Sequence, residues 1–114
     1  MKTVQNLQLS QMLRDALQAA RDRIMVEFDV DRMVVFGSAA RGELDEESDA
    51  DLLVVLTKRP DHRTRDRITR LILDINLEYD TNLSELIVDR ETWDHGLGSV
   101  LPIHQEVEEE GVRL

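Results

Sequence analysis

Apolar residues recur at steps of three and four positions near the start of the chain, which predicts an amphipathic helix from Leu7 to about Phe28. A second stripe with the same spacing begins after Thr64, a residue type that favours the capping position of a helix, and runs to Tyr79. The apolar positions are Leu9, Leu13, Ala16, Leu17, Ala20, Ile24 and Phe28 in the first helix, and Ile68, Leu71, Ile72, Ile75 and Tyr79 in the second.

Three short apolar runs predict β-strands. They span Met33 to Phe36, Asp51 to Thr57 and Leu83 to Val88. The second run is almost continuously apolar, which suits a strand covered on both faces. Strands separated by helices in this way indicate a sheet on which the helices pack.

The remaining segments read as turns and one more helix. Residues 58–63 and 96–99 are expected to be loops, and Pro102 is expected to start a short helix that Gly111 ends. Residues 112–114 could add an edge strand. The order of elements therefore predicts an α/β (α+β) fold, a small mixed sheet with helices mainly on one face.

Length and composition favour one small domain. The chain has 114 residues, of which 41% are hydrophobic and none is cysteine. A chain of this length is expected to bury one hydrophobic core, which suits a single domain over residues 1–114. Without cysteine, the chain can form neither disulfides nor thiolate zinc sites. We expect a cytoplasmic protein, since no stretch approaches the roughly 20 apolar residues of a membrane span and the amino terminus does not resemble a signal peptide.

The charge balance bears on the partners. The formal net charge of −10 argues against binding of free nucleic acid, because polyanions repel acidic proteins. The stretch from Lys58 to Arg70 differs, with six basic and two acidic residues. Two interpretations stay open for it: a solvated helix face, or a basic rim for a nucleotide, RNA or an acidic partner.

Two aspartates open the second predicted strand. Positions i and i+2 of a strand face the same way, so Asp49 and Asp51 should present their carboxylates on one side. The first strand ends in Gly37-Ser38, where backbone N–H groups could approach a phosphate, and Arg41 could neutralise phosphate charge. Same-side carboxylates beside an anion-binding turn suit Mg²⁺-dependent phosphoryl or nucleotidyl transfer. The alternative is that Asp49 caps a loop and Asp51 merely opens the strand.

These motifs resemble the nucleotidyltransferase superfamily that includes DNA polymerase β, and most closely its minimal nucleotidyltransferases, small prokaryotic proteins often encoded beside a HEPN-domain partner. The resemblance implies the polymerase β-like fold, ATP as the nucleotide and Mg²⁺ as the metal. It also implies a nucleotide site and a metal site. The segments that carry it are Gly37-Ser38, Arg41-Gly42, Ser48-Asp49-x-Asp51-Leu52, Leu77-Glu78-Tyr79, Arg90-Glu91-x-Trp93 and the ending Glu109-Glu110-Gly111-Val112-Arg113-Leu114. The implied nucleotide-binding residues are Gly37, Ser38, Arg41 and Gly42, and the implied metal ligands are Asp49 and Asp51.

A third carboxylate is expected on the neighbouring strand in this superfamily. The candidate is Glu85, which would join Asp49 and Asp51 as a catalytic residue and metal ligand. The alternative is that Ser84 occupies this position and that Glu85 is an exposed edge residue.

The resemblance implies an enzyme that transfers AMP from ATP to a hydroxyl of a HEPN-type toxin partner, as the antitoxin of that pair. The alternative is a catalytically weak or inactive module of the same fold, which binds its partner with or without a nucleotide. So small a core would recognise its acceptor through a partner or a second copy of itself, so a homodimer is a further possibility.

Overall fold

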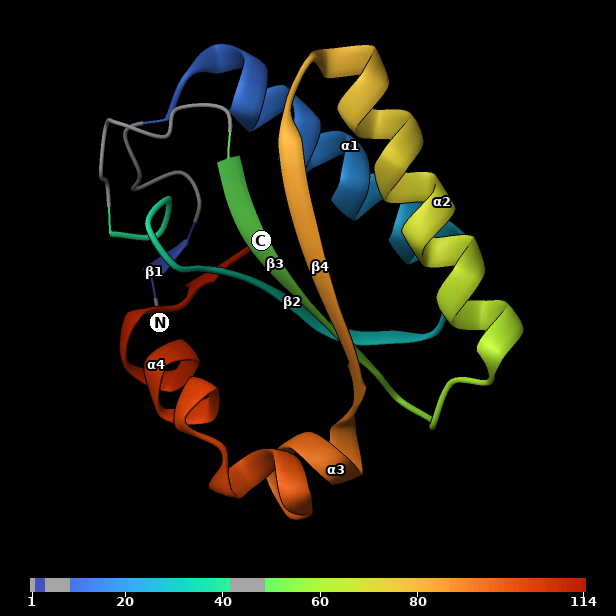
Figure 1. The fold of residues 1–114 in the computed structure, drawn as a ribbon, viewed down its shortest axis with the longest axis vertical. Helices are drawn as coiled ribbons and strands as arrows, with labels where there is room; N and C mark the ends of the chain where they lie inside the picture. The colour runs from blue at the N-terminus through green and yellow to red at the C-terminus, as the bar shows by residue number, and fades with distance from the viewer. Residues whose placement is uncertain (1, 4–8, 42–48) are drawn as a thin grey trace.

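A mixed five-stranded sheet forms the centre of the protein (Figure 1). The computed structural model describes residues 2–3, 9–41 and 49–114. The strands lie in the order β1-β5-β2-β3-β4, in which β3 runs antiparallel to β2 and parallel to β4. The long strands are β2 (Val30–Phe36), β3 (Asp49–Leu56) and β4 (Asn82–Asp89), and the short ones are β1 (Lys2–Thr3) and β5 (Val112–Arg113).

Two long helices cover one face of the sheet, which we call the long-helix face. They are α1 (Gln11–Glu27) and α2 (His62–Tyr79); in the view of Figure 1, α1 passes behind β4 and α2 lies beside β4, to its right. Their apolar stripes bury side chains against alternate residues of the strands, and this cluster is the larger part of the core. From the strands it includes Met33, Val35, Ala50, Leu52, Val54, Leu56, Leu83 and Ile87.

Shorter elements cover part of the opposite face, which we call the short-helix face. They are α3 (Arg90–Asp94), the 3₁₀ helix η3 (Leu97–Val100) and α4 (Pro102–Glu110). Trp93 of α3 and Val107 of α4 are buried there in a second apolar cluster. The strand residues of that cluster are Val34, Phe36, Leu53 and Val55, which alternate with those of the first cluster.

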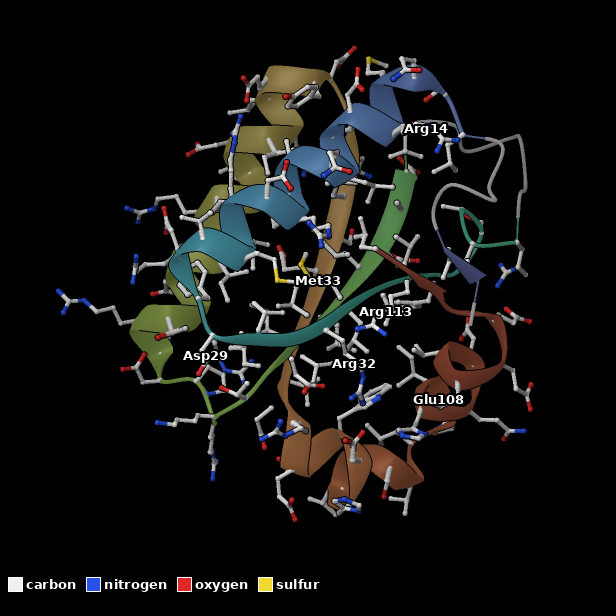
Figure 2. The ribbon with its side chains drawn as sticks, turned by 180° about the vertical axis from the view of Figure 1, so that it is seen from behind. Arg14, Asp29, Arg32, Met33, Glu108 and Arg113 are labelled. Carbon is white, nitrogen blue, oxygen red and sulfur yellow. The ribbon has the colours of Figure 1, made fainter. Side chains whose placement is uncertain are left out.

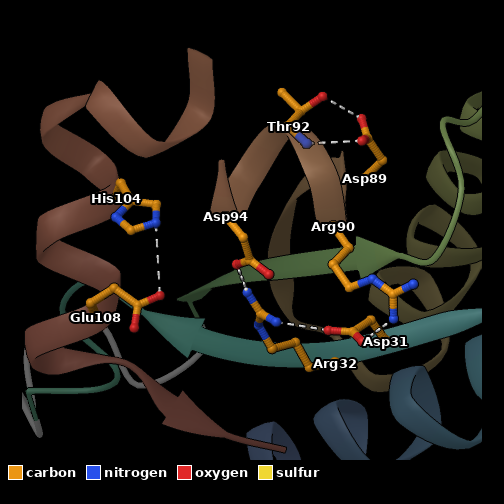
Figure 3. Close-up of polar contacts among 8 residues, drawn as sticks. All are labelled: Asp31, Arg32, Asp89, Arg90, Thr92, Asp94, His104 and Glu108. Carbon is orange, nitrogen blue, oxygen red and sulfur yellow. Dashed lines mark hydrogen bonds and ion pairs between the residues drawn. The ribbon is translucent and has the colours of Figure 1, made fainter. Parts of the chain in front are cut away.

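An ion-pair network holds α3 to β2 on the short-helix face (Figure 3). The guanidinium of Arg32 lies between the carboxylates of Asp31, at 2.7 Å, and Asp94, at 2.5 Å. Arg90 adds a contact of 3.2 Å to Asp31. Figure 2 shows Arg32 and its neighbour Met33 on opposite sides of β2, with Met33 in the core under the long helices.

The fold confirms the predicted mixed sheet with its two long helices on one face, and corrects several boundaries. The predicted start of the first helix, Leu7, lies outside the described residues; α1 begins at Gln11, after Ser10 accepts the Leu13 N–H. The second helix starts earlier than predicted. Asp61 is its N-cap and accepts the N–H of Thr64, the residue predicted to cap it.

The region after β4 is more helical than predicted. The short α3 was not predicted, and most of the expected loop 96–99 forms η3. The helix starting at Pro102 is confirmed. A strand also forms in residues 112–114, but this β5 pairs with both β1 and β2 and is not the expected edge strand. Within the described residues, no helix has both the length and the apolar character needed to cross a bilayer.

Candidate functional site

The two aspartates lie at the beginning of β3, on the short-helix face. Asp49 and Asp51 alternate with residues of the long-helix core and share their face with Leu53. Both are half-buried. At a rise of about 3.3 Å per residue their Cα atoms are about 6.6 Å apart. The structure therefore brings the two predicted carboxylates to one face, as the strand pattern indicated.

Gly37 packs directly against Asp51. β2 pairs with β3 so that Phe36 lies opposite Asp51, and the chain turns away at the next residue. Gly37 has φ of +75°, a left-handed conformation that L side chains rarely adopt, and a Cβ placed there would lie 2.5 Å from Oδ2 of Asp51. Only glycine therefore fits at the end of β2 while this carboxylate keeps its position.

The segment after Gly37 is a single tight turn. The N–H of Arg41 donates to the carbonyls of Gly37, at 3.2 Å, and Ser38, at 3.1 Å. Ser38 is half-buried, and the two alanines that follow it are buried. Gly42, the last residue expected to bind the nucleotide, lies outside the described residues. Within the described part, Gly37 and Ser38 therefore lie in a tight turn beside Asp51.

Arg41 reaches α4. Its Nη1 lies 3.1 Å from Glu110 and 3.4 Å from Glu106, and all three side chains are exposed. Exposed ion pairs contribute little and exchange readily. A phosphate at the turn would compete with these carboxylates for the guanidinium of Arg41.

The pairing of β3 with β4 separates Glu85 from the aspartates. In this parallel pair Asp51 lies opposite Ser84, and Leu52 lies opposite Glu85. Paired residues of neighbouring strands share a face, so Ser84 is on the short-helix face with Asp51, whereas Glu85 is on the other face. The register does not fit the expectation that Glu85 joins the two aspartates, and it favours the alternative arrangement with Ser84.

Glu85 lies in a partly desolvated position. It is half-buried at the edge of the sheet, and burial raises the pKa of its carboxyl, although its own backbone N–H partly offsets that rise. Its neighbours Leu83 and Ile87 on the same face are core residues under the long helices. Ser84, the alternative to Glu85 in the sequence, is exposed on the face of the aspartates, and so is Asn82, a polar side chain that sequence reasoning did not single out for the site.

The two aspartates suit a magnesium ion that also binds water and substrate phosphates, rather than an ion enclosed entirely by protein ligands. In the portions 2–3, 9–41 and 49–114, no group of three or more His, Asp or Glu side chains could hold a metal ion. Mg²⁺ in nucleotide sites keeps several waters and uses one or two carboxylates together with substrate phosphates. Asp49 and Asp51 beside the Gly37 turn provide such a pair.

The basic stretch lies away from these carboxylates. Its first residues follow the far end of β3, about 25 Å from Asp49 along an eight-residue strand. The side chains of Lys58, Arg59 and Arg63 are exposed there, and Arg67 pairs with Glu27 at 3.2 Å. The start of this stretch therefore does not rim the pair of aspartates.

Comparison with known proteins agrees with this geometry. A family model described as a nucleotidyltransferase domain matches residues 14–95. A putative protein adenylyltransferase of Methanocaldococcus jannaschii is 38% identical over 58 residues, which are 51% of this chain and 59% of that protein. The matched part is thus less than two thirds of the relative's length.

A solved structure shows the same fold. A putative nucleotidyltransferase of Sulfolobus solfataricus superposes with a TM-score of 0.53 and 17% identity, covering 93% of this chain and 87% of that chain. The toxin–antitoxin complex MntA–HpeT gives a TM-score of 0.49 and 20% identity, covering 89% of this chain and 68% of the other. Since the family model spans most of the sequence, including the Gly37 turn and both aspartates, the chain belongs to the nucleotidyltransferase domain family.

Proposed function

We propose that this protein, as a single domain over residues 1–114, transfers AMP from ATP to a hydroxyl group of a protein partner, with Mg²⁺ bound by Asp49 and Asp51. The observation that carries this proposal is the close packing of Gly37 against Asp51, which sets the turn proposed to bind phosphate directly beside a carboxylate. Family membership supports nucleotidyl transfer, and the name of the Methanocaldococcus relative supports AMP and a protein acceptor.

The chain's own residues have distinct roles in this proposal. Backbone N–H groups of the turn after Gly37, the Ser38 hydroxyl and the Arg41 guanidinium bind the triphosphate. Asp49 and Asp51 hold the metal, which, when bound, neutralises phosphate charge and polarises the α-phosphate. Gly42 continues the nucleotide-binding segment in the motif.

The proposed partner is a HEPN-type toxin, which the protein would neutralise as its antitoxin. This part of the proposal is supported by the likeness of the Gly-Ser and Asp-x-Asp motifs to the minimal nucleotidyltransferases. The net charge of −10 favours a protein partner with a basic surface over free nucleic acid.

A second candidate function is a binding module with weak or no catalysis. One observation favours it: the side chain opposite Asp51 on β4 is Ser84, so β4 adds no carboxylate to this face at that position. Such a site could bind Mg·ATP and a partner yet transfer AMP slowly.

The test is calorimetry of Mg·ATP binding followed by incubation with ATP labelled at the α-phosphate and a purified HEPN-domain protein. We expect Mg·ATP binding and label on the partner. Asp49→Asn and Asp51→Asn should each weaken Mg·ATP binding at least about tenfold, since each removes a ligand charge. The matched control is Asp74→Asn, an exposed acid on α2, which should bind as the wild type does.

The outcomes distinguish the enzyme from the binding module. Label on the partner supports the enzyme, whereas a stable complex without label supports the binding module. Unchanged Mg·ATP affinity in both aspartate variants would contradict the assigned metal site.

A further inference from the structure

Three alternate side chains of β4 form an exposed strip beside the candidate metal site. Asn82, Ser84 and Leu86 are all exposed, and we call them the β4 strip. The register sets them opposite Asp49, Asp51 and Leu53 in turn. Neighbouring strands are about 4.8 Å apart, so the strip is one strand away from the carboxylates.

The short helices leave this strip open. Further along the same face of β4, Val88 packs against the cluster that contains Trp93 and Val107. Leu86 does not belong to that cluster and is 37% exposed. An apolar side chain thus lies open next to two polar ones, at the end of the face that the described short helices do not cover.

The outer edge of β4 is occupied by side chains of α2. The amide of Asn76 accepts the N–H of Leu83 at 2.8 Å and donates to its carbonyl at 3.0 Å. Arg65 donates to the carbonyl of Ile87 at 3.0 Å. These contacts use three of the backbone groups that an added strand would need, which favours approach of a partner segment across the face of β4 over approach along its edge.

The order of the strands sets the direction of attack. The Gly37 turn follows β2, the carboxylates are on β3, and the β4 strip is on the far side of the carboxylates. Phosphoryl and nucleotidyl transfers place the attacking and leaving oxygens on opposite sides of the phosphorus. With the β- and γ-phosphates at the Gly37 turn, the acceptor oxygen approaches from β4.

We propose that the β4 strip is the acceptor-docking surface, and that it selects a protein hydroxyl flanked by an apolar side chain. This inference rests on the proposed function. The flanking apolar side chain packs on Leu86, while Ser84 and Asn82 hydrogen-bond the acceptor backbone. The acceptor oxygen forms a bond to the α-phosphorus, the bond from that phosphorus to the bridging oxygen breaks, pyrophosphate leaves, and the hydroxyl proton passes to water.

The test uses two synthetic peptide acceptors that differ only beside the hydroxyl. One carries leucine on both sides of a tyrosine, and the other carries aspartate at both places. AMP transfer from α-labelled ATP to each peptide is measured, together with chemical-shift changes of the Leu86 methyl groups on peptide addition. The wild type should favour the leucine peptide by about tenfold in kcat/KM, the factor expected when part of a leucine side chain is buried.

Matched variants test whether the preference for the leucine peptide depends on Leu86. Leu86→Lys should raise KM for the leucine peptide about tenfold while the Kd for Mg·ATP stays unchanged, because the strip is separate from the phosphate turn. Leu86→Met should retain the preference, since it keeps an apolar side chain. The control Leu73→Lys changes an exposed leucine of α2 and should behave as the wild type does.

Failure of this inference can be distinguished from failure of the proposed function. Absence of Mg·ATP binding in the wild type would overturn both. Normal Mg·ATP binding with no difference between the peptides, or an equal loss in Leu86→Lys and Leu73→Lys, would overturn the docking surface alone. The docking surface would also be overturned if the Leu86 methyl resonances did not shift at saturating leucine peptide.

Discussion

A Cβ atom on Gly37 would lie 2.5 Å from Oδ2 of Asp51, so the end of β2 and the start of β3 fit together only without a side chain at that position. The contact joins the Gly-Ser motif at the end of β2 to the Asp-x-Asp motif at the start of β3. It also ties the conformation of the proposed phosphate turn to the position of a proposed metal ligand.

Gly37→Ala is therefore expected to impair the site. The added methyl group displaces the Asp51 carboxylate, and a non-glycine residue in the left-handed region costs roughly 1–2 kcal/mol. We expect at least about a tenfold rise in the Kd for Mg·ATP, measured by calorimetry.

The control for this variant is Gly98→Ala. A Cβ at Gly98 would lie 2.8 Å from the carbonyl oxygen of Thr92, so this change also strains the fold, but against α3. It should lower the melting temperature and leave the Kd for Mg·ATP unchanged. Equal losses of affinity in both variants would show that the effect of Gly37 is one of general stability.

Arg41 offers a test of competition between phosphate and protein carboxylates. Its contacts with Glu106 and Glu110 must loosen if it is to bind a nucleotide. Glu110→Gln should therefore tighten Mg·ATP binding by a few-fold, roughly the 0.2–1 kcal/mol of an exposed ion pair, with the melting temperature nearly unchanged. Arg41→Gln should weaken binding, and both effects should shrink in high salt. Weaker binding in Glu110→Gln would contradict this role for Arg41.

Asp89 is expected to stabilise α3 through its cap. Its carboxylate accepts the hydroxyl of Thr92 at 2.7 Å and the backbone N–H of Thr92 at 2.9 Å, and these hydrogen bonds lower the pKa of Asp89. Asp89→Ala should reduce the free energy of unfolding by about 1 kcal/mol near neutral pH.

The pH dependence of this effect has a definite sign. A lowered pKa in the folded state adds stability above the ordinary value of 3.8, and that stability is lost as pH falls through the folded-state pKa. The difference between wild type and Asp89→Ala should therefore shrink in acid. A difference that stays constant from neutral pH to acid would assign the effect to packing and not to the ionised cap.

Local patterns predicted much of this structure. The helical stripes that end near Phe28 and Tyr79 are long enough for their period to be unmistakable, and the i, i+2 spacing of Asp49 and Asp51 fixes their common face. Short elements carry no such period. The five residues of α3 could have been found only from the cap, in which Asp89 precedes Thr92 by three positions.

The pairing of β3 with β4 could not be predicted in the same way. The sequence from Leu83 to Leu86 has apolar residues at both ends and two polar residues between them. Apolar and polar residues therefore do not alternate, and the pattern does not show which face of the strand is buried. The choice between Ser84 and Glu85 depends on a register between strands separated by a whole helix, which no local pattern encodes.

The register between β3 and β4 makes opposite predictions for Ser84 and Glu85. Ser84→Asp places a third carboxylate opposite Asp51, on the same face, so it should tighten Mg²⁺ binding about tenfold or more and raise turnover if the site is catalytic. The matched change at the next position is Glu85→Gln, which alters a carboxyl on the other face. Titration with Mg²⁺ in the presence of ATP measures both variants.

Glu85→Gln should leave the Mg²⁺ affinity at the wild-type value and stabilise the fold near neutral pH. Burial raises the pKa of Glu85, so the wild type gains stability in acid and loses it as pH rises through the folded-state pKa. Glutamine is neutral at every pH, so the variant should melt at a higher temperature than the wild type near neutral pH, and the difference should vanish below about pH 4, close to the ordinary pKa of glutamate. A loss of Mg²⁺ affinity in Glu85→Gln, with no gain in Ser84→Asp, would mean that β4 is shifted by one residue and that Glu85 faces the aspartates.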